Sequence, residues 1–200
     1  MFTLPDDLGP GPHLFGVDLY HGDDPVDFHE LAEQGITFCF LKATQGLSEA
    51  DPLYDSYYER AHSVGLKVGS YHFFDPEAEG GDQAQHFYST AHFTPGDLIP
   101  VLDSETPGGW VLQATTAFAF ALKQKIGRNP ILYTGDAFFT ENYAGTPMAD
   151  LTRWIARYGA KPANACTFWQ FSENAQLPGQ SRGLDADVFF GSDLSPYLVT

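Results

Sequence analysis

The chain has 200 residues, enough for one domain with a sizeable core, and 43% of them are hydrophobic, including 17 Phe and 10 Tyr, which excludes a disordered chain. Its 26 acidic and 10 basic side chains give a formal net charge of -16, which repels nucleic acid phosphates and anionic lipid surfaces. We therefore expect neither nucleic acid nor a membrane as a partner, and no apolar run is long enough to suggest a membrane span.

The N-terminal residues differ in composition from the rest. Residues 1–13 are rich in Pro, Gly and Asp and predict an N-terminal arm, and residues 14–200 predict a single domain. The first residues lack a basic stretch followed by a long apolar run, so no signal peptide is expected and synthesis is expected in the cytoplasm. Cys39 and Cys166 both lie in apolar, strand-like runs and are predicted to be buried reduced thiols.

Strand and helix signals alternate through the first two thirds of the chain. Short apolar, β-favouring runs predict strands at 15–20, 36–44, 66–74, 98–103 and 130–134. Helical spacing with start and stop residues predicts helices after each of them, at about 24–35, 51–65, 81–92, 110–126 and 136–143. In the first helix we expect Asp24 as N-cap and Pro25 at the first helical position.

The last third of the chain contains strands without helices. Strand-like runs at 152–157, 167–171 and 184–189 are joined by linkers rich in Gly, Pro, Asn and Ser, which show no helical period. The chain is therefore predicted to be an α/β protein, an irregular TIM-like barrel of five β/α units followed by three β-strands. An open doubly wound sheet is the main alternative, but no Gly-rich phosphate loop follows the first strand.

Two carboxylates follow the fourth predicted strand. Asp103 and Glu105 are two residues apart, so in extended backbone they point the same way. Close carboxylates repel when both are ionised, so one keeps its proton, which is what a glycosidase requires of its acid. The alternatives are a solvated acidic loop or a helix N-terminus that attracts negative charge.

Other carboxylates are predicted to join this pair. Active sites of β/α barrels lie at the carboxyl ends of the strands. Asp18 ends the first predicted strand and Asp185 lies in the last, and these two strands are neighbours in a closed barrel. We therefore expect Asp18 and Asp185 to face Asp103 and Glu105 across the mouth.

Aromatic and polar side chains are predicted at the same rim. Their flat faces and hydrogen-bonding tips suit sugar rings, although core packing is the alternative for any single one. The predicted sugar-binding residues are Tyr71, His72, Tyr133, Trp154, Tyr158, Trp169 and Gln170.

Eight segments in order carry a family resemblance. They are Phe-Gly-Val-Asp18-Leu-Tyr, Phe-Leu-Lys42-Ala-Thr44-Gln-Gly, Gly69-Ser-Tyr71-His72-Phe-Phe, Val-Leu-Asp103-Ser-Glu105, Pro-Ile-Leu-Tyr133-Thr, Trp154-Ile-Ala-Arg-Tyr158, Trp169-Gln170-Phe and Asp185-x-Asp187-x-Phe189. From about Phe15 to Ser192 the chain resembles glycoside hydrolase family 25, the Chalaropsis-type lysozymes.

The resemblance implies a muramidase. Such an enzyme cleaves the β-1,4 bond from N-acetylmuramic acid to N-acetylglucosamine in peptidoglycan with retention, on a barrel like the one predicted above. By the family pattern, Glu105 is the proton donor and later the base. Asp103 assists the substrate acetamido group as nucleophile, and Asp18 and Asp185 shape the electrostatics of the site.

Three features depart from the family pattern. The residue between the two carboxylates is usually apolar and is Ser104 here, which bears on the packing behind the strand. The final motif usually carries Asn where this chain has Asp187, which we expect to add charge near the site and to raise the pKa of a neighbouring group. Wall-binding repeats, common beside this catalytic domain, are absent from this sequence.

Two other functional classes are considered. One is a non-catalytic glycan-binding barrel, against which the presence of all four carboxylates argues. The other is a metal-dependent hydrolase, but the seven His residues form no His-x-His or His-Glu-x-x-His pattern, so neither metal nor cofactor is expected.

The partner expected from the resemblance is a peptidoglycan glycan strand, bound by a monomer. We expect the protein to reach the bacterial wall after lysis, as a phage endolysin would, or through a secretion machine as an antibacterial effector. A basic immunity or secretion-carrier protein would fit its acidic charge.

Overall fold

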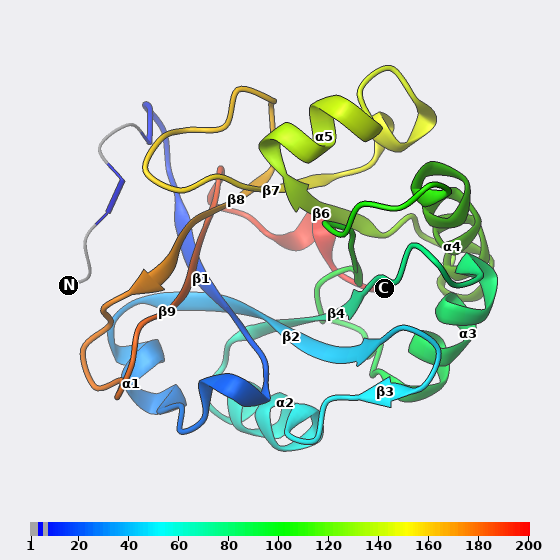
Figure 1. Ribbon diagram of the computed structural model, residues 1–200. Coiled ribbons are helices and arrows are strands. Elements are labelled where there is room, and N and C mark those ends of the chain that lie inside the picture. The colour runs from blue at the N-terminus through cyan, green and yellow to red at the C-terminus, as the bar shows by residue number, and fades with distance from the viewer. Residues whose placement is uncertain (1–3, 6–7) are drawn as a thin grey trace.

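The computed structural model describes residues 4–5 and 8–200, and eight of its strands form a closed barrel (Figure 1). The barrel strands are β1 (Leu14–Leu19), β2 (Ile36–Gln45), β4 (Lys67–Phe73), β5 (Val101–Asp103), β6 (Ile131–Gly135), β7 (Arg153–Ala156), β8 (Phe168–Ala175) and β9 (Leu184–Phe189). Their order is β1-β9-β8-β7-β6-β5-β4-β2, and pairing of β1 with β2 closes the ring. The predicted TIM-like barrel is confirmed. The two-residue β3 (Glu49–Ala50), which was not predicted, pairs with the end of β2.

Five α-helices follow the first five barrel strands, as predicted. They are α1 (Phe28–Glu33), α2 (Tyr54–Ser63), α3 (Gly80–Thr90), α4 (Val111–Ile126) and α5 (Asp136–Asn142). Short 3-10 turns lie at His21–Asp23, Pro147–Asp150 and Ser195–Tyr197. The connections among β7, β8 and β9 contain no α-helix, and in Figure 1 loops cover that side while α3 and α4 lie side by side on the other. No helix among the described residues has the length and hydropathy needed to cross a membrane.

The start of α1 differs from the prediction. Asp24 and Pro25 precede the helix and are joined by a cis peptide bond, and Asp27 is the N-cap. The Asp27 carboxylate accepts hydrogen bonds from the backbone N–H groups of His29 and Glu30, at 3.0 and 3.1 Å. Asp27 thus satisfies the free N–H groups of the first turn, so the helix begins at Phe28.

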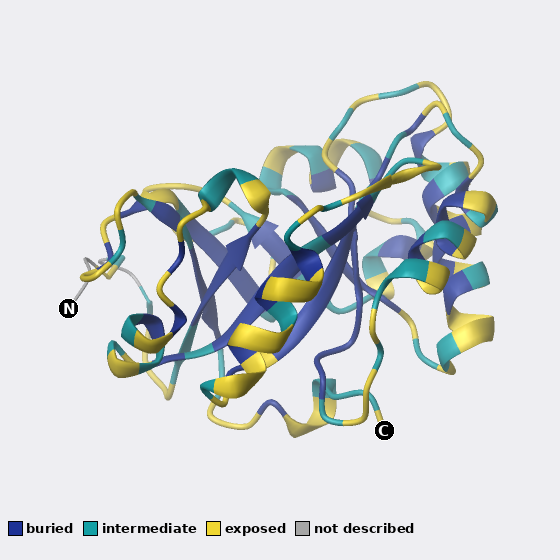
Figure 2. Cartoon of the chain, turned by 90° about the horizontal axis from the view of Figure 1, so that it is seen from below, coloured by how far each residue is buried: buried dark blue, intermediate teal, exposed yellow. Residues whose placement is uncertain are grey.

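Side-chain alternation along the strands separates two cores. Inside the barrel lie mainly aromatic side chains, among them Phe38, Phe40, Trp154, Phe168 and Phe189. The alternate residues pack outward against the helices, as Cys39, Leu41 and Ala43 do on β2. Figure 2 shows the barrel strands buried over most of their length and the helices exposed on their outer faces.

The last strand runs against its neighbours. β9 is antiparallel to both β1 and β8, whereas β1, β2 and β4 to β8 follow one another in parallel. Asp185 lies near the start of β9, opposite Asp18 near the end of β1. Because the strand is reversed, its beginning lies at the barrel mouth.

The N-terminal segment was predicted as an arm over residues 1–13, of which 1–3 and 6–7 lie outside the described residues. Residues 8–13 lie along the loop 161–166, and the His13 ring contacts Phe190 edge-on at 5.6 Å. Both cysteines are free, as predicted. Cys39 is fully buried, whereas Cys166 is only half-buried.

Candidate active site

A pocket of about 200 Å³ opens at the mouth of the barrel. Every barrel strand contributes to it directly or through the residue just after it. The lining consists of Asp18, Tyr20, Lys42, Tyr71, Phe73, Asp103, Glu105, Tyr133, Trp154, Gln170 and Asp185. The four predicted carboxylates therefore share one cavity with four of the predicted sugar-binding residues, Tyr71, Tyr133, Trp154 and Gln170.

Asp103 and Glu105 differ in depth. Asp103 ends β5 and is 6% exposed, whereas Glu105 lies two residues on, exposed at the edge of the pocket. Burial raises the pKa of Asp103 well above its usual value, and the charge of Glu105 adds to this. Partial burial also raises the pKa of Glu105, and in both cases the Lys42 ammonium opposes the shift. Both groups thus hold protons to higher pH than a solvated carboxyl.

Ser104 points the opposite way, into the layer between the barrel and α5. Its hydroxyl is 2.7 Å from the Tyr143 hydroxyl, and both side chains are buried. The polar residue that departs from the family pattern is therefore paired, and it does not disturb the packing behind β5.

Asp18 and Asp185 are directly opposite each other on β1 and β9. Gln170 bridges them, because its Nε2 donates to Asp18 Oδ2 at 2.8 Å and to Asp185 Oδ2 at 3.4 Å. Burial raises the pKa of both carboxyls, that of Asp185 to about 7, and neighbouring acidic charges add to the shift. Asp187 and Asp185 act on Asp18 in this way.

Two tyrosines fix the Gln170 amide. Tyr133 Oη donates to Gln170 Oε1 at 2.8 Å, and Tyr158 Oη donates to the same oxygen at 3.0 Å. With both lone pairs of Oε1 engaged, the amide nitrogen is directed at the carboxylates. Tyr158 is 46% exposed at the rim, beside the lining residues, so it is also available to a ligand.

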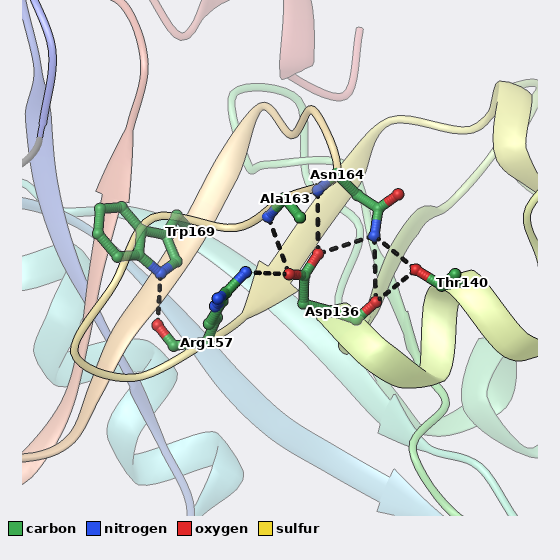
Figure 3. Close-up of polar contacts among 6 residues, drawn as sticks. All are labelled: Asp136, Thr140, Arg157, Ala163, Asn164 and Trp169. Carbon is green, nitrogen blue, oxygen red and sulfur yellow. Dashed lines mark hydrogen bonds and ion pairs between the residues drawn. The ribbon is translucent and has the colours of Figure 1, made fainter.

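The loop that carries Tyr158 is held by Asp136, the first residue of α5 (Figure 3). The Asp136 carboxylate accepts hydrogen bonds from Arg157 Nη1, from the backbone N–H groups of Ala163 and Asn164, and from Asn164 Nδ2, at 2.8 to 3.0 Å. These bonds lower the pKa of Asp136 although burial opposes them. The rim loop is thus attached at both ends to one ionised side chain.

Two predicted sugar-binding residues, His72 and Trp169, lie outside the pocket. His72 is fully buried, stacks on Phe118 at 5.0 Å and is hydrogen-bonded through Nδ1 to Thr44 and through Nε2 to Gln83. Burial lowers the His72 pKa to about 4, so the ring is neutral. Its role is to join the barrel wall to the α3–α4 layer.

Trp169 is fully buried in the outer core as well. Its Nε1 donates to the Arg157 carbonyl at 2.7 Å (Figure 3), and its ring stacks on Phe190. Side-chain alternation explains both corrections, because Tyr71 and Gln170 point inward and their next neighbours therefore point outward.

Three lining residues, Tyr20, Lys42 and Phe73, were not predicted as site residues. Lys42 Nζ donates to Gln45 Oε1 at 2.6 Å and lies 4.8 Å from the Phe73 ring centroid. The signal was present for Lys42, which is in phase with the inward-facing Phe38 and Phe40 on β2. Tyr20 and Phe73 carry the same signal, because each lies two residues after an inward-facing residue, Asp18 and Tyr71.

Among the described residues, no group of three or more His, Cys, Asp or Glu side chains is arranged to hold a metal ion. Gln170 bridges Asp18 and Asp185 on adjacent strands, whereas Asp103 and Glu105 lie on the other side of the barrel mouth. The arrangement suits proton transfer and the stabilisation of a developing positive charge.

Comparison with known proteins agrees with this geometry. The autolytic lysozyme of Clostridium acetobutylicum is 33% identical over 87% of this chain, which spans 55% of that relative's length. A family 25 glycosyl hydrolase from Bacillus anthracis has a TM-score of 0.85 at 25% identity, covering 94% of each chain. A bacterial lysozyme from Streptomyces coelicolor has a TM-score of 0.83 at 26% identity, covering 91% of this chain and 94% of its own.

A family model described as glycosyl hydrolases family 25 matches residues 17–180. The matched residues include three of the four carboxylates, Asp18, Asp103 and Glu105. The match covers most of the barrel, and the structural likeness extends over the rest. The chain therefore belongs to glycosyl hydrolase family 25.

Proposed function

We propose that this protein is a peptidoglycan muramidase that hydrolyses the β-1,4 bond between N-acetylmuramic acid and N-acetylglucosamine with retention. The observation that carries the proposal is the convergence of Asp18, Asp103, Glu105 and Asp185 in one open pocket at the barrel mouth. The relatives named as lysozymes support the choice of substrate.

Glu105 is the proposed acid and base. Its exposed position lets it reach a glycosidic oxygen at the pocket edge, and its raised pKa lets it keep a proton to higher pH than a solvated carboxyl does. It gives that proton to the leaving oxygen as the bond to the anomeric carbon breaks. In the second step the Glu105 carboxylate takes a proton from the attacking water.

Asp103 is the proposed partner of the substrate acetamido group. Its Oδ1 is buried and has no hydrogen-bond partner in the protein, so it offers an acceptor to an acetamido N–H. This bond would turn the acetamido oxygen toward the anomeric carbon, where it forms a bond as the leaving group departs. Water, which gives a proton to Glu105, then attacks the anomeric carbon from the other face as the bond to the acetamido oxygen breaks, and the original configuration is restored.

Asp18 and Asp185 are proposed to stabilise the positive charge that develops on the sugar ring. Gln170 fixes their orientation, and Tyr133 and Tyr158 fix Gln170. A site whose dipoles are already oriented loses little energy in reorganising during the reaction.

Sugar binding is assigned mainly to the side chains with free surface. Tyr20 and Tyr158 are 44% and 46% exposed and Phe73 is half-buried, so their faces are available to a pyranose. Tyr71, Tyr133 and Trp154 are at most 8% exposed and form the floor. Trp154 stacks on Phe40 at 4.4 Å and is also part of the inner core.

The test is Glu105→Gln, with Glu59→Gln as the matched control, because Glu59 is exposed on the outside of α2. We expect Glu105→Gln to reduce kcat by about 10²- to 10⁴-fold, as removal of a general acid does, and Glu59→Gln to clear cell walls at the wild-type rate. Equal clearing by Glu105→Gln and wild type would remove Glu105 from the acid role.

Product analysis decides the bond that is cut. A muramidase leaves N-acetylmuramic acid at the new reducing end of digested peptidoglycan, whereas cleavage of the other linkage leaves N-acetylglucosamine. If the wild-type protein binds several walls but releases no reducing ends, the non-catalytic glycan-binding barrel is the correct function.

The route to the wall and the partners are also proposals. We propose release by lysis or by a specialised secretion machine, with a basic immunity or carrier protein binding the acidic surface, and a monomeric enzyme. The net charge of -16 supports a basic partner. Affinity capture from the producing cells at low and high salt, with light scattering for the oligomeric state, would test these proposals.

A further inference from the structure

Asp187 is a buried carboxyl group that the proposed reaction does not use. It lies on β9 below the pocket and is fully buried, and it is not among the lining residues. Trp154 Nε1 donates to Oδ1 at 2.8 Å, but Oδ2 is buried without any donor. An ionised carboxylate in such a place would lack both solvent and a counter-charge, which is costly.

Asp187 interacts with Asp18, an acidic residue on the adjacent strand β1. In the register of β1 and β9, Gly16 is opposite Asp187 and Asp18 is opposite Asp185, so Asp18 faces both acidic residues of β9. The carboxyl groups of Asp18 and Asp187 are within hydrogen-bonding reach of each other. Two carboxyl groups form a hydrogen bond only when one of them carries a proton.

No positive charge nearby substitutes for that proton. Among the described residues lining the pocket, Lys42 is the sole cation, and it acts on Asp103 and Glu105 on the other side of the mouth. The groups that face Asp187 from the surrounding elements are neutral or acidic: Asp18 from β1, Trp154 from β7, Gln170 from β8 and Asp185 from β9, with Asp103, Tyr71 and Tyr133 near Asp18.

Each of the two carboxyls accepts one side-chain hydrogen bond, so solvent access decides which of them is neutral. Asp18 Oδ2 already accepts a hydrogen bond from Gln170 Nε2, and the Asp18 side chain reaches the pocket, where it is 8% exposed. Asp187 has no exposure at all and one donor. The ionised form is therefore better supported at Asp18 than at Asp187.

We propose that Asp187 is a positioning residue that is held as a neutral carboxylic acid and donates a hydrogen bond from Oδ2 to the Asp18 carboxylate. This inference rests on the proposed function for its catalytic consequence, because it fixes the charge and orientation of Asp18 beneath the sugar. Burial and then the charge of Asp185 raise the pKa of Asp187 well above its usual value, while its hydrogen bonds with Trp154 and Asp18 oppose the rise. The pKa of Asp18 is raised as well, so the proton is assigned to Asp187 on its complete burial and on the unpartnered Oδ2.

The first test is a proton count that needs no substrate. In protein labelled with ¹³C at the aspartate carboxyl, wild type should show protonated carboxyl signals at neutral pH, because burial raises the pKa of Asp103 and Asp185 as well. We expect Asp187→Asn to lack one of these signals. If Asp187→Asn keeps every protonated signal of wild type, or if wild type has none, the proposal is wrong. This result is independent of whether the protein cleaves peptidoglycan.

The second test is rescue by a neutral hydrogen-bond donor. Asp187→Leu removes the hydrogen bonds to Asp18 and Trp154, and we expect kcat/KM to fall by about 100-fold. Asp187→Asn can donate to Asp18 with a side chain of the same shape, and we expect it to recover most of that loss. We also expect the alkaline limb of its pH profile at the wild-type position, because no charge has been removed.

A shift of that limb to lower pH in Asp187→Asn would show that a negative charge had been lost from the site, and it would overturn the proposal. Equal loss of activity in both variants would do the same. If Asp187→Leu does not fold, the carboxyl signal and the pH profile of Asp187→Asn still decide. If wild type has no muramidase activity, the proposed function fails while the carboxyl signal still tests Asp187.

Discussion

Lys42 has an influence on the carboxyl pair that its own contacts do not reveal. Its ammonium bonds to Gln45 and lies over the Phe73 ring, while its charge lowers the pKa of both Asp103 and Glu105 against the larger effect of burial. The pKa of Glu105, the proposed acid, is therefore set by two opposing effects, burial and the charge of Lys42. Removing the cation should leave burial unopposed.

The first prediction concerns Lys42→Met. Without the ammonium, the pKa of Glu105 rises, so Glu105 keeps its proton to higher pH. We expect the alkaline limb of the kcat/KM profile to move upward by about one pH unit. The control is Lys67→Met, since Lys67 is exposed at the opposite end of β4 and should leave the limb in place. A limb that is unmoved or moved downward in Lys42→Met would contradict the assignment of Glu105 as the acid.

The residue scale also shows where sequence reasoning succeeded and where it failed. Asp103 and Glu105 share a pocket because their spacing of two fits extended backbone. The same alternation places His72 and Trp169 on the opposite face of their strands from Tyr71 and Gln170. Alternation alone therefore excludes His72 and Trp169 from the pocket lining and includes Lys42.

At the element scale, the five helices and eight barrel strands were predictable because each has a strong local signal. The direction of β9 was not predictable, because the alternation of inward and outward side chains is the same whichever way a strand runs. Its antiparallel course still brings Asp185 to the mouth beside Asp18. The start of α1 was misplaced because Asp24 and Asp27 are both good N-caps, and the local sequence does not rank them.

The connection between β7 and β8 gives the second prediction. Asp136 on α5 holds this loop through Arg157 and Asn164, and the loop carries Tyr158 (Figure 3). We expect Asp136→Ala to lower the free energy of unfolding by about 1–3 kcal/mol. We also expect faster hydrogen exchange over 158–165 and a raised KM, because Tyr158 loses its fixed position.

Asp150→Ala is the control for this loop, since Asp150 is exposed in the 3-10 turn before β7. It should leave both hydrogen exchange and KM at wild-type values. Unchanged exchange over 158–165 in Asp136→Ala would mean that the loop is held by other contacts. Tyr158→Phe separates the two effects, because it removes the hydrogen bond to Gln170 without releasing the loop.

At the scale of the whole molecule, negative charge is concentrated where it is least easily solvated. The chain carries a net charge of -16, and three of the four buried acidic residues in the described part of the chain, Asp18, Asp103 and Asp187, lie together at one end of the barrel. Bacterial walls are anionic as well, so substrate binding must depend on contacts in the pocket. The cost of this arrangement falls on folding stability, because these carboxyls bind protons more tightly in the folded state.

The third prediction follows from Asp185, whose pKa is raised from 3.8 to about 7 by burial and by neighbouring acidic charges. Between these values the unfolded chain has released the proton that the folded chain still binds, so Asp185 lowers stability progressively as pH rises through this window. His72, with its pKa lowered to about 4, acts in the opposite direction, so only a comparison with a variant isolates the Asp185 effect.

We therefore expect the difference in free energy of unfolding between Asp185→Asn and wild type, measured with urea, to rise in favour of the variant by on the order of 2 kcal/mol from pH 4 to pH 7. The Asn variant cannot ionise, so it is spared the burial of a charge and the repulsion from Asp23, Glu173 and Glu105. Asp150→Asn should follow the wild-type pH dependence. If the difference between Asp185→Asn and wild type stayed constant with pH, or had the opposite sign, Asp185 would be ionised throughout and the acidic mouth would carry no stability cost.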